Sequence, residues 1–421
     1  MKKITLFILF LSVTIAVKAQ VYTEKQTRHR FAQMTLGLDF QSSFGGQTIV
    51  DPFSPSPTLL DFKSTQSSHF IIGGTHFWGH ADFYVAIPLF SIQHEYENNY
   101  DIFHSSGVET VFKYYPWRIE DGKIRPFIGV SLAPFSFQQG QNSEPFQTGA
   151  LQSNIGLPIL SGVTFNRKNH LIELNLLYNY NNEIDYYLSE NYQTTIQTPP
   201  IYASLAYKFM FETTLSAEQS WENGKTEEVT NRLAKNGKLN GFFVGAGMSS
   251  TWLIGQSDYN ENYRPYIPTY DNAVMPDFTI GYYLHNPDVN IAVNYRGYSQ
   301  GAMAYGTQQS TRRRSVGLEV TKGLFDYHGF VPFVGPIVSY ENLSFSELTP
   351  IMSAPRAFSD NRIGYGLTLG WDIRPNRIQW FVLRTNLRYF PNLKLPTSDS
   401  VVNFNNIEFN FIQMVVYPNR I

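Results

Sequence analysis

The sequence predicts an all-β protein, a transmembrane antiparallel up-and-down β-barrel, with about 16 strands in total. Three observations predict this class. Apolar and polar residues alternate along short segments, which places each set on one face of a strand. The connections between these segments alternate between long polar loops and short turns, as in outer-membrane barrels. After the N-terminal segment, no apolar run is long enough for a transmembrane helix.

Composition excludes several other classes of protein. Lys+Arg 32 and Asp+Glu 34 are nearly balanced, so there is no basic surplus for binding nucleic acid. Cys is absent, which excludes disulfides, thiolate metal sites and Cys nucleophiles. Tyr 27 and Phe 33 are high counts for a chain with 16% charged residues. Aromatic residues concentrate at the membrane interfaces of such barrels, so this surplus fits the predicted class.

Residues 1–19 are predicted to be a signal peptide. Lys2 and Lys3 form a positive start, residues 4–17 are apolar, and small residues at Val17 and Ala19 favour cleavage before Gln20. The alternative is a retained anchor helix, but the apolar run falls short of the roughly 20 residues that a bilayer requires. We therefore expect export by the general secretory route.

The rest of the chain divides into two similar units around a connector. The first eight-strand unit is predicted at 20–212 and the second at 240–421, with a polar, mildly helical periplasmic connector at 213–239. The first unit has predicted strands at 33–40, in the hairpin 70–91, at 107–116 and 125–137, on both sides of the turn 166–169, and at 201–211. The second has them at 241–252, in the hairpin 278–299, at 314–325 and 331–340, on both sides of the turn 374–377, and at 405–418.

Residue identities between the two units predict an internal duplication. The hairpins 70–91 and 278–299 align without a gap, and Phe70/Phe278, Ile72/Ile280, Gly73/Gly281, Val85/Val293 and Ser91/Ser299 coincide. The run PFIG at 126–129 matches PFVG at 332–335. The offset between the units changes only in predicted loops and turns, where insertions are tolerated.

Strand faces favour a membrane barrel over a soluble sandwich. Ile172, Leu174 and Leu176 share one face, and Glu173 and Asn175 share the other. Aromatic residues such as those at 178, 180, 389 and 390 lie at strand ends, as expected at a membrane interface. Closing the sheet satisfies every backbone group in lipid and leaves no free edge.

The run VETVFKYYPWRIEDGKIRPFIGVSL at 108–132 resembles the mid-barrel hairpin of Bacteroidetes-type outer-membrane β-barrel domains. In that family a Lys-Tyr-Tyr-Pro strand end precedes a turn and an Arg-Pro-Phe strand. The last strand, which ends at Val416-Tyr417-Pro418, is similar to their closing strands. The chain departs from the pattern by ending on Ile421 instead of an aromatic residue. The resemblance implies location in the outer membrane of a Gram-negative bacterium and insertion by the barrel-assembly machinery, and it implies no single activity.

Sixteen strands can close in two ways. One barrel would leave an aqueous lumen, whereas two tandem eight-stranded barrels would be filled by their own side chains. The long connector favours two barrels, but a single closure buries more lipid-facing area per strand, so one barrel is slightly preferred. We therefore expect a passive porin-like channel for small polar solutes. The alternative is a non-channel structural or partner-binding barrel that acts through its surface loops or periplasmic connector.

Polar residues on the inward strand faces are the candidate functional residues: Glu109, Lys113, Glu173, Lys208, Arg296, Glu319, Arg384, Arg388 and Glu408. They either line a pore or form internal ion pairs. Arg312, Arg313 and Arg314 are predicted at the outer rim, as ordinary rim charge or as a site for anionic solutes and lipopolysaccharide phosphates.

His94 and His104 flank an acidic loop and are expected to be solvated. We expect no enzyme activity and no catalytic, cofactor or metal site. The expected partners are outer-membrane lipid and lipopolysaccharide, with no nucleic acid and no identifiable protein partner.

Overall fold

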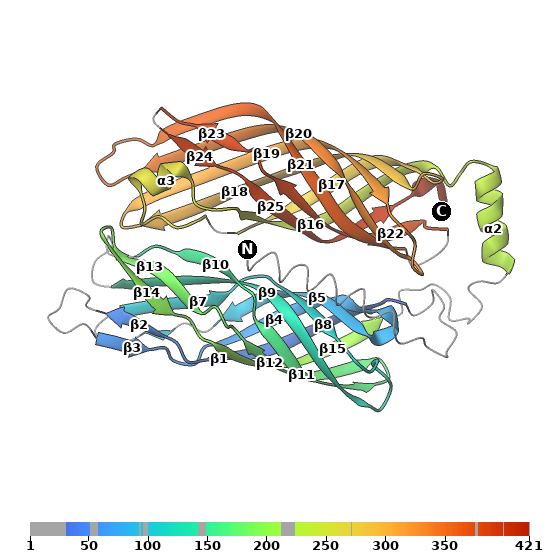
Figure 1. Ribbon diagram of the computed structural model, residues 1–421, viewed down its shortest axis with the longest axis horizontal. Helices are drawn as coiled ribbons and strands as arrows, with labels where there is room; N and C mark the ends of the chain where they lie inside the picture. Colours follow the sequence, from blue (N-terminus) through green and yellow to red (C-terminus); the bar gives the residue numbers. More distant parts are fainter. Residues whose placement is uncertain are drawn as a thin grey trace.

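The computed structural model describes residues 31–50, 58–91, 94–95, 100–141, 149–211, 224–270, 272–374, 378–398 and 400–420. It contains two eight-stranded antiparallel barrels that lie side by side (Figure 1). The signal peptide predicted at 1–19 lies outside the described residues.

Eight strands close the first barrel. They are β1 (Gln33–Phe44), β4 (Gln66–His76), β5 (Ala81–Ser91), β8 (Glu109–Tyr114), β9 (Ile124–Gln141), β11 (Ile159–Arg167), β12 (His170–Tyr178) and β15 (Ile201–Phe211). Strand β1 pairs with β4 on one side and with β15 on the other. The ring continues through β5, β8, β9, β11 and β12 back to β15.

Another eight strands close the second barrel. They are β16 (Gly241–Leu253), β17 (Ala273–Leu284), β18 (Val289–Ala304), β19 (Thr307–Gly323), β20 (Phe330–Leu348), β21 (Arg356–Ile373), β22 (Phe381–Phe390) and β25 (Asn406–Val416). Strands β25 and β16 pair to complete the ring.

The strand prediction is confirmed, and the slight preference for one sixteen-stranded barrel is wrong. A single barrel requires β15 to pair with β16 and β25 to pair with β1. In the structure the free edge of β1 is taken by β15, and that of β16 by β25. The edge strands of each half therefore pair with each other and leave no free edge. This is the arrangement of two tandem eight-stranded barrels that the sequence left open.

Most further elements lie at the end of the barrels that carries the long connections, which we call the long-loop end. A small sheet consists of β2 (Gln47–Val50), β3 (Thr58–Asp61), β13 (Glu183–Ser189) and β14 (Tyr192–Gln197). Strands β6 (His94–Glu95), β7 (Tyr100–Ser106) and β10 (Gln152–Gly156) extend the first barrel, and α3 (Asp258–Tyr263), β23 (Lys394–Pro396) and β24 (Val401–Asn403) extend the second. Residues 181–199, which precede the predicted strand at 201–211, thus contain the β13–β14 hairpin.

The opposite, short-turn end carries little structure of its own. It holds η2 (Phe77–Gly79), η4 (Pro418–Arg420) and the helix α2 (Gly224–Lys235), which lies within the predicted connector (Figure 1). Within the described ranges, none of the helices is both long and apolar enough to span a membrane.

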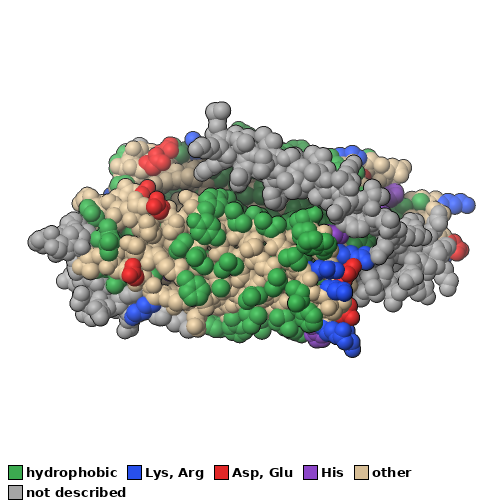
Figure 2. Space-filling model, turned by 60° about the horizontal axis from the view of Figure 1, so that its bottom comes forward, with side chains coloured by type: hydrophobic (Ala, Val, Ile, Leu, Met, Phe, Trp, Pro, Cys, Tyr) green, Lys and Arg blue, Asp and Glu red, His purple; other side chains and the backbone are tan. Residues whose placement is uncertain are grey.

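The outward faces of the strands form an apolar surface. Along β12, Leu174 is 59% exposed whereas its neighbour Glu173 is completely buried, because successive side chains alternate between the outside and the lumen. Figure 2 shows hydrophobic side chains across the middle of one face, with charged side chains toward its ends. A closed barrel that turns apolar side chains outward and polar ones inward is a transmembrane β-barrel.

The two barrels contact each other at an apolar cluster on their outer faces and again at the long-loop end. The outward side chains of Phe83 and Val85 on β5 are buried in a cluster shared with β25, and Phe83 lies 5.6 Å from Trp371 of β21, centroid to centroid. At the long-loop end, the Tyr305 hydroxyl donates a hydrogen bond to the backbone oxygen of Tyr187 over 2.8 Å. These contacts join the outer walls of two separately closed barrels.

Candidate functional site

A cluster of buried ion pairs fills the lumen of the first barrel in the half nearer the short-turn end. Lys113 Nζ lies 2.6 Å from Glu173 Oε2, and Lys208 Nζ lies 2.9 Å from Glu173 Oε1. Lys208 also pairs with Asp82. All four side chains are completely buried. The ammonium of Lys208 lies 4.2 Å from the ring centroid of Tyr84, a cation–π contact. Each charge in the cluster therefore has a partner of opposite sign.

Arginines and carboxylates fill the second lumen more densely. Arg313 makes two 2.7 Å contacts with the carboxylate of Glu341 and also binds Glu408, which in turn binds Arg296. Nearer the short-turn end, Arg388 contacts Asp277 at 2.6 Å and Glu319 at 2.8 Å, and Arg384 makes a bidentate pair with Asp372. Bidentate pairing fixes both planar groups, so these side chains form a rigid plug.

The mouth of the second barrel is closed by the α3 loop. The Ser257 hydroxyl caps α3 by accepting a hydrogen bond from the Asn260 backbone N–H over 3.2 Å. Tyr259 Oη donates to Glu347 over 3.0 Å, and Gln309 Nε2 donates both to Asn260 and to Glu347. Tyr270 Oη donates to Gln309 over 2.7 Å. The second barrel is thus filled along its axis and covered at its long-loop end.

The structure places all the predicted lumen residues inside a barrel. Each is at most 6% exposed: Glu109, Lys113, Glu173, Lys208, Arg296, Glu319, Arg384, Arg388 and Glu408. Glu109 and Glu319 differ in their surroundings. Glu319 binds Arg388, whereas Glu109 accepts a weak hydrogen bond from Ser131 over 3.5 Å and faces His69.

Two sequence predictions need correction. Arg313 is not at the outer rim, because its side chain is 1% exposed and points into the lumen, while Arg312 and Arg314 are exposed on the outer face. His104 is not solvated, since it is 8% exposed. The side chain of His94 lies outside the described residues.

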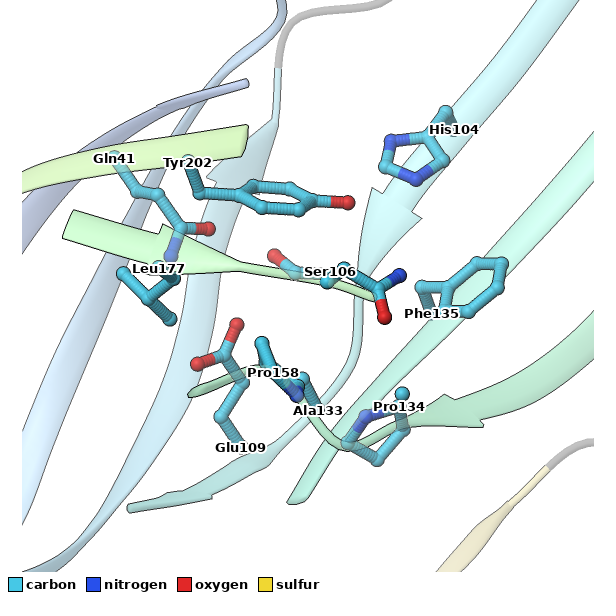
Figure 3. Close-up of a pocket in the computed structure, with 12 residues that line it drawn as sticks. Gln41, His104, Ser106, Glu109, Ala133, Pro134, Phe135, Pro158, Leu177 and Tyr202 are labelled. Atoms are coloured by element: carbon cyan, nitrogen blue, oxygen red, sulfur yellow. The ribbon is translucent and has the colours of Figure 1, made fainter. Parts of the chain in front are cut away.

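Toward the long-loop end, the lumen of the first barrel contains a cavity and a chain of hydrogen-bonded polar residues. His69 Nδ1 lies 2.7 Å from Asp39 Oδ1, and His69 Nε2 lies 2.7 Å from Ser106 Oγ. His69 is completely buried and Asp39 is 6% exposed. Ser106 lines the cavity together with Gln41, His104, Glu109, Asn179 and Tyr202 (Figure 3).

Sequence reasoning missed this group because its members come from separate elements. Asp39 and His69 are direct partners across β1 and β4, and Ser106 ends β7, which lies between the predicted strands at 70–91 and 107–116. No motif spacing connects the three residues.

The part of the chain that the structure describes contains no group of three or more His, Asp or Glu side chains that could hold a metal ion.

Comparison with known proteins gives no family assignment. No family model matches the sequence, and no curated protein matches it. Among solved structures, Neisserial surface protein A has 19% identity, a TM-score of 0.32, and coverage of 42% of this chain and 96% of its own. Ail of Yersinia pestis, in complex with the heparin analogue sucrose octasulfate, has 14% identity, a TM-score of 0.26, and coverage of 42% and 96%. OmpT of Vibrio cholerae has 9% identity, a TM-score of 0.17, and coverage of 94% and 100%. TM-scores this low carry no argument about function.

Proposed function

We propose that this chain is a non-conducting protein of the Gram-negative outer membrane, in which a pair of barrels anchors a binding surface at the long-loop end. Its apolar outer faces and closed sheets suit a bilayer. Long connections face the cell exterior in outer-membrane barrels, so the proposal puts the long-loop end outside the cell.

The observation that carries this proposal is the filling of the lumens. Eight strands enclose an interior just wide enough for side chains, and here that interior holds buried ion pairs around Glu173 in the first barrel and Arg388 in the second. A conducting path would require these pairs to separate. Breaking a buried pair leaves an uncompensated charge, at a cost of about 3–5 kcal/mol. This favours the non-channel alternative over the porin-like channel.

The long-loop end supports a role in binding. Strands continue past the apolar surface there and enclose a core of buried side chains drawn from both barrels, including Phe137, Tyr186, Ile267 and Phe345. Loops that only connect strands do not need such a core. A rigid platform shared by two barrels presents a fixed surface to a partner, because ordering costs on binding are lower for a preorganised surface.

Planar-bilayer recording of the purified full-length chain tests the proposal. We expect no steady single-channel current from folded protein at any potential that the bilayer withstands. A sixteen-stranded porin in the same bilayer serves as the positive control. A stable, reproducible open-channel current from this chain would reject the proposal and support the porin-like channel.

We also infer that the two barrels descend from one duplicated unit. The pairing register supports this inference. Ile72 opposes Val85 in the first barrel, and Ile280 opposes Val293 in the second, at the same sequence offset. The register between the first two strands of each barrel is also equivalent, with Thr35 opposite Gly73 and Phe243 opposite Gly281. The Bacteroidetes-type barrel domain stays the predicted family of the unit.

A further inference from the structure

We propose that the lumen of the first barrel, toward the long-loop end, holds a nucleophilic site, in which Ser106 takes the acyl group of a small carboxylic ester and His69 acts as its general base. This activity goes beyond the binding role proposed above and does not depend on it. The proposal rests on the geometry of Asp39, His69 and Ser106, and on the cavity into which that chain of residues leads.

Hydrogen bonding fixes the orientation and the tautomer of His69. An ionised carboxylate only accepts hydrogen bonds, so the 2.7 Å contact with Asp39 Oδ1 places the imidazole proton on Nδ1. The same Asp39 oxygen also accepts the backbone N–H of His69 over 3.1 Å, which holds the two residues in register. In the neutral imidazole Nε2 is then left as an acceptor, and it lies 2.7 Å from Ser106 Oγ. This is the arrangement that activates a serine hydroxyl.

The cavity beside Ser106 contains buried polar atoms without partners. Among the described residues, His104 Nε2 and Asn179 Oδ1 have no hydrogen-bond partner, although their side chains are 8% and 3% exposed. Both residues line the cavity with Ser106. Leaving such an atom buried and unpaired is unfavourable, so a polar ligand that bonds to these atoms would be stabilised. Figure 3 shows the Tyr202 hydroxyl reaching toward the same space.

The composition of the cavity indicates the class of substrate. Phe135, Leu177, Pro134 and Pro158 supply an apolar wall, and Gln41 adds a carboxamide. An apolar wall suits a short acyl or alkyl group, while carboxamide and imidazole groups suit the oxygens of an ester. The cavity volume is only about 20 Å³, room for one or two water molecules, so at most an acetyl-sized acyl group lies inside it and the rest of the substrate must lie outside.

The reaction balances without a cofactor. Ser106 Oγ attacks the ester carbonyl carbon while its proton passes to His69 Nε2, and the imidazolium that forms is stabilised by Asp39. The tetrahedral intermediate expels the alcohol, which takes the proton from His69. Water then attacks the acyl-serine with His69 again as the base, which releases the carboxylic acid and restores Ser106. Asp39 is a positioning residue, because it contacts His69 and not the reacting atoms.

A covalent probe tests the site in the full-length chain, folded in detergent. We expect a fluorophosphonate with a short alkyl chain to label Ser106, as located by mass spectrometry, and p-nitrophenyl acetate to be hydrolysed. Ser106→Ala should lose both signals. The matched control Ser136→Ala, which removes a hydroxyl hydrogen-bonded to that of Ser153 instead of an imidazole, should keep both. A difference in gel migration between heated and unheated samples reports that each variant is folded.

Asp39→Asn separates a positioning role from a merely structural one. An amide N–H directed at Nδ1 favours the opposite tautomer, in which Nε2 carries the proton and no longer accepts from Ser106. We expect folded Asp39→Asn protein to be labelled about 10⁴-fold more slowly. In the wild type, labelling should also slow as acid protonates His69, which faces the carboxyls of Asp39 and Glu109.

Three outcomes would overturn the proposal. Folded wild-type protein could remain unlabelled and inactive toward the ester. The probe could attach to a residue other than Ser106. Folded Ser106→Ala could hydrolyse the ester at the wild-type rate. Each would leave the Asp39–His69–Ser106 chain as a structural hydrogen-bond network.

Discussion

The lumens of the two barrels are filled by different kinds of ion pair. The second barrel uses arginines in bidentate pairs, such as Arg384 with Asp372, and it is covered by α3. The first barrel uses lysines in the half nearer the short-turn end and leaves a cavity toward the long-loop end, beside Ser106. The strand registers of the two walls are equivalent where the hairpins repeat. Walls of equivalent register can therefore enclose a lumen that is filled along its axis or one that keeps a small cavity.

Removal of a lumen arginine should have the largest effect on stability. Arg388→Ala leaves Asp277 and Glu319 buried without their cation, so we expect a loss of about 3–5 kcal/mol in the free energy of unfolding. Lys113→Ala should cost less, because Glu173 keeps its contact with Lys208. Urea titration followed by gel migration measures both.

The control for these variants is Arg312→Ala, whose side chain faces outward on β19. We expect a change within about 0.5 kcal/mol. If Arg388→Ala is no more destabilising than Arg312→Ala, the lumen ion pairs do not hold the second barrel together.

Gly129 and Gly335 occupy the same position in the matching PFIG and PFVG runs, and they should respond alike to substitution by alanine. A Cβ on Gly129 would lie 2.1 Å from the backbone oxygen of Phe112, and one on Gly335 would lie 1.8 Å from that of Val320. Backbone must shift in both cases, so Gly129→Ala and Gly335→Ala should each cost about 1–3 kcal/mol. Gly301→Ala is the control, since its nearest contact is 3.6 Å away. A large difference between Gly129→Ala and Gly335→Ala would count against equivalent walls.

The short-turn ends of the two barrels should lose different amounts of stability in acid. Burial alone would raise the pKa of Asp288, but hydrogen bonds and charge from Arg374 outweigh it and hold the pKa below its ordinary 3.8. The stabilisation is therefore complete above pH 3.8 and is lost as the pH falls below that value. We expect the stability difference between wild type and Asp288→Asn to shrink as the pH drops from 5 to 2, about the range of carboxyl titration.

At the short-turn end of the first barrel, the loss of stability in acid should have the same direction and be smaller. A hydrogen bond from Arg118, aided by Arg125, lowers the pKa of Glu120, but this side chain is 37% exposed and its charge is screened by solvent. Glu120→Gln should therefore change the acid response less than Asp288→Asn does, and salt should weaken its effect further. An equal response from both variants would contradict this ranking.

The sequence predicted the walls better than the lumens. Alternation placed Glu173 inside and Leu174 outside, because a period of two depends only on local geometry. The same parity, extended backwards from Glu319, assigns Arg313 to the lumen, so that error was avoidable. The number of barrels was not predictable in this way, because it depends on which distant strand pairs with β1. The meeting of Asp39, His69 and Ser106 likewise depends on non-local register and on the course of a loop.

The most direct test of the two-barrel structure is a disulfide between β1 and β15, the first and last strands of the first barrel. Leu38 on β1 and Tyr207 on β15 are paired outward-facing residues, and the absence of native cysteine makes the experiment unambiguous. Directly opposed strand residues lie about 4.5–5.5 Å apart between Cα atoms, within the disulfide range of about 4.4–6.8 Å.

Two closed barrels predict that mild oxidation links Leu38→Cys to Tyr207→Cys in the folded full-length chain. The control pair, Leu38→Cys with Met414→Cys on β25, should remain unlinked. A single sixteen-stranded barrel would pair β1 with β25 instead. Linkage of the Leu38–Met414 pair without linkage of the Leu38–Tyr207 pair would contradict the two-barrel structure.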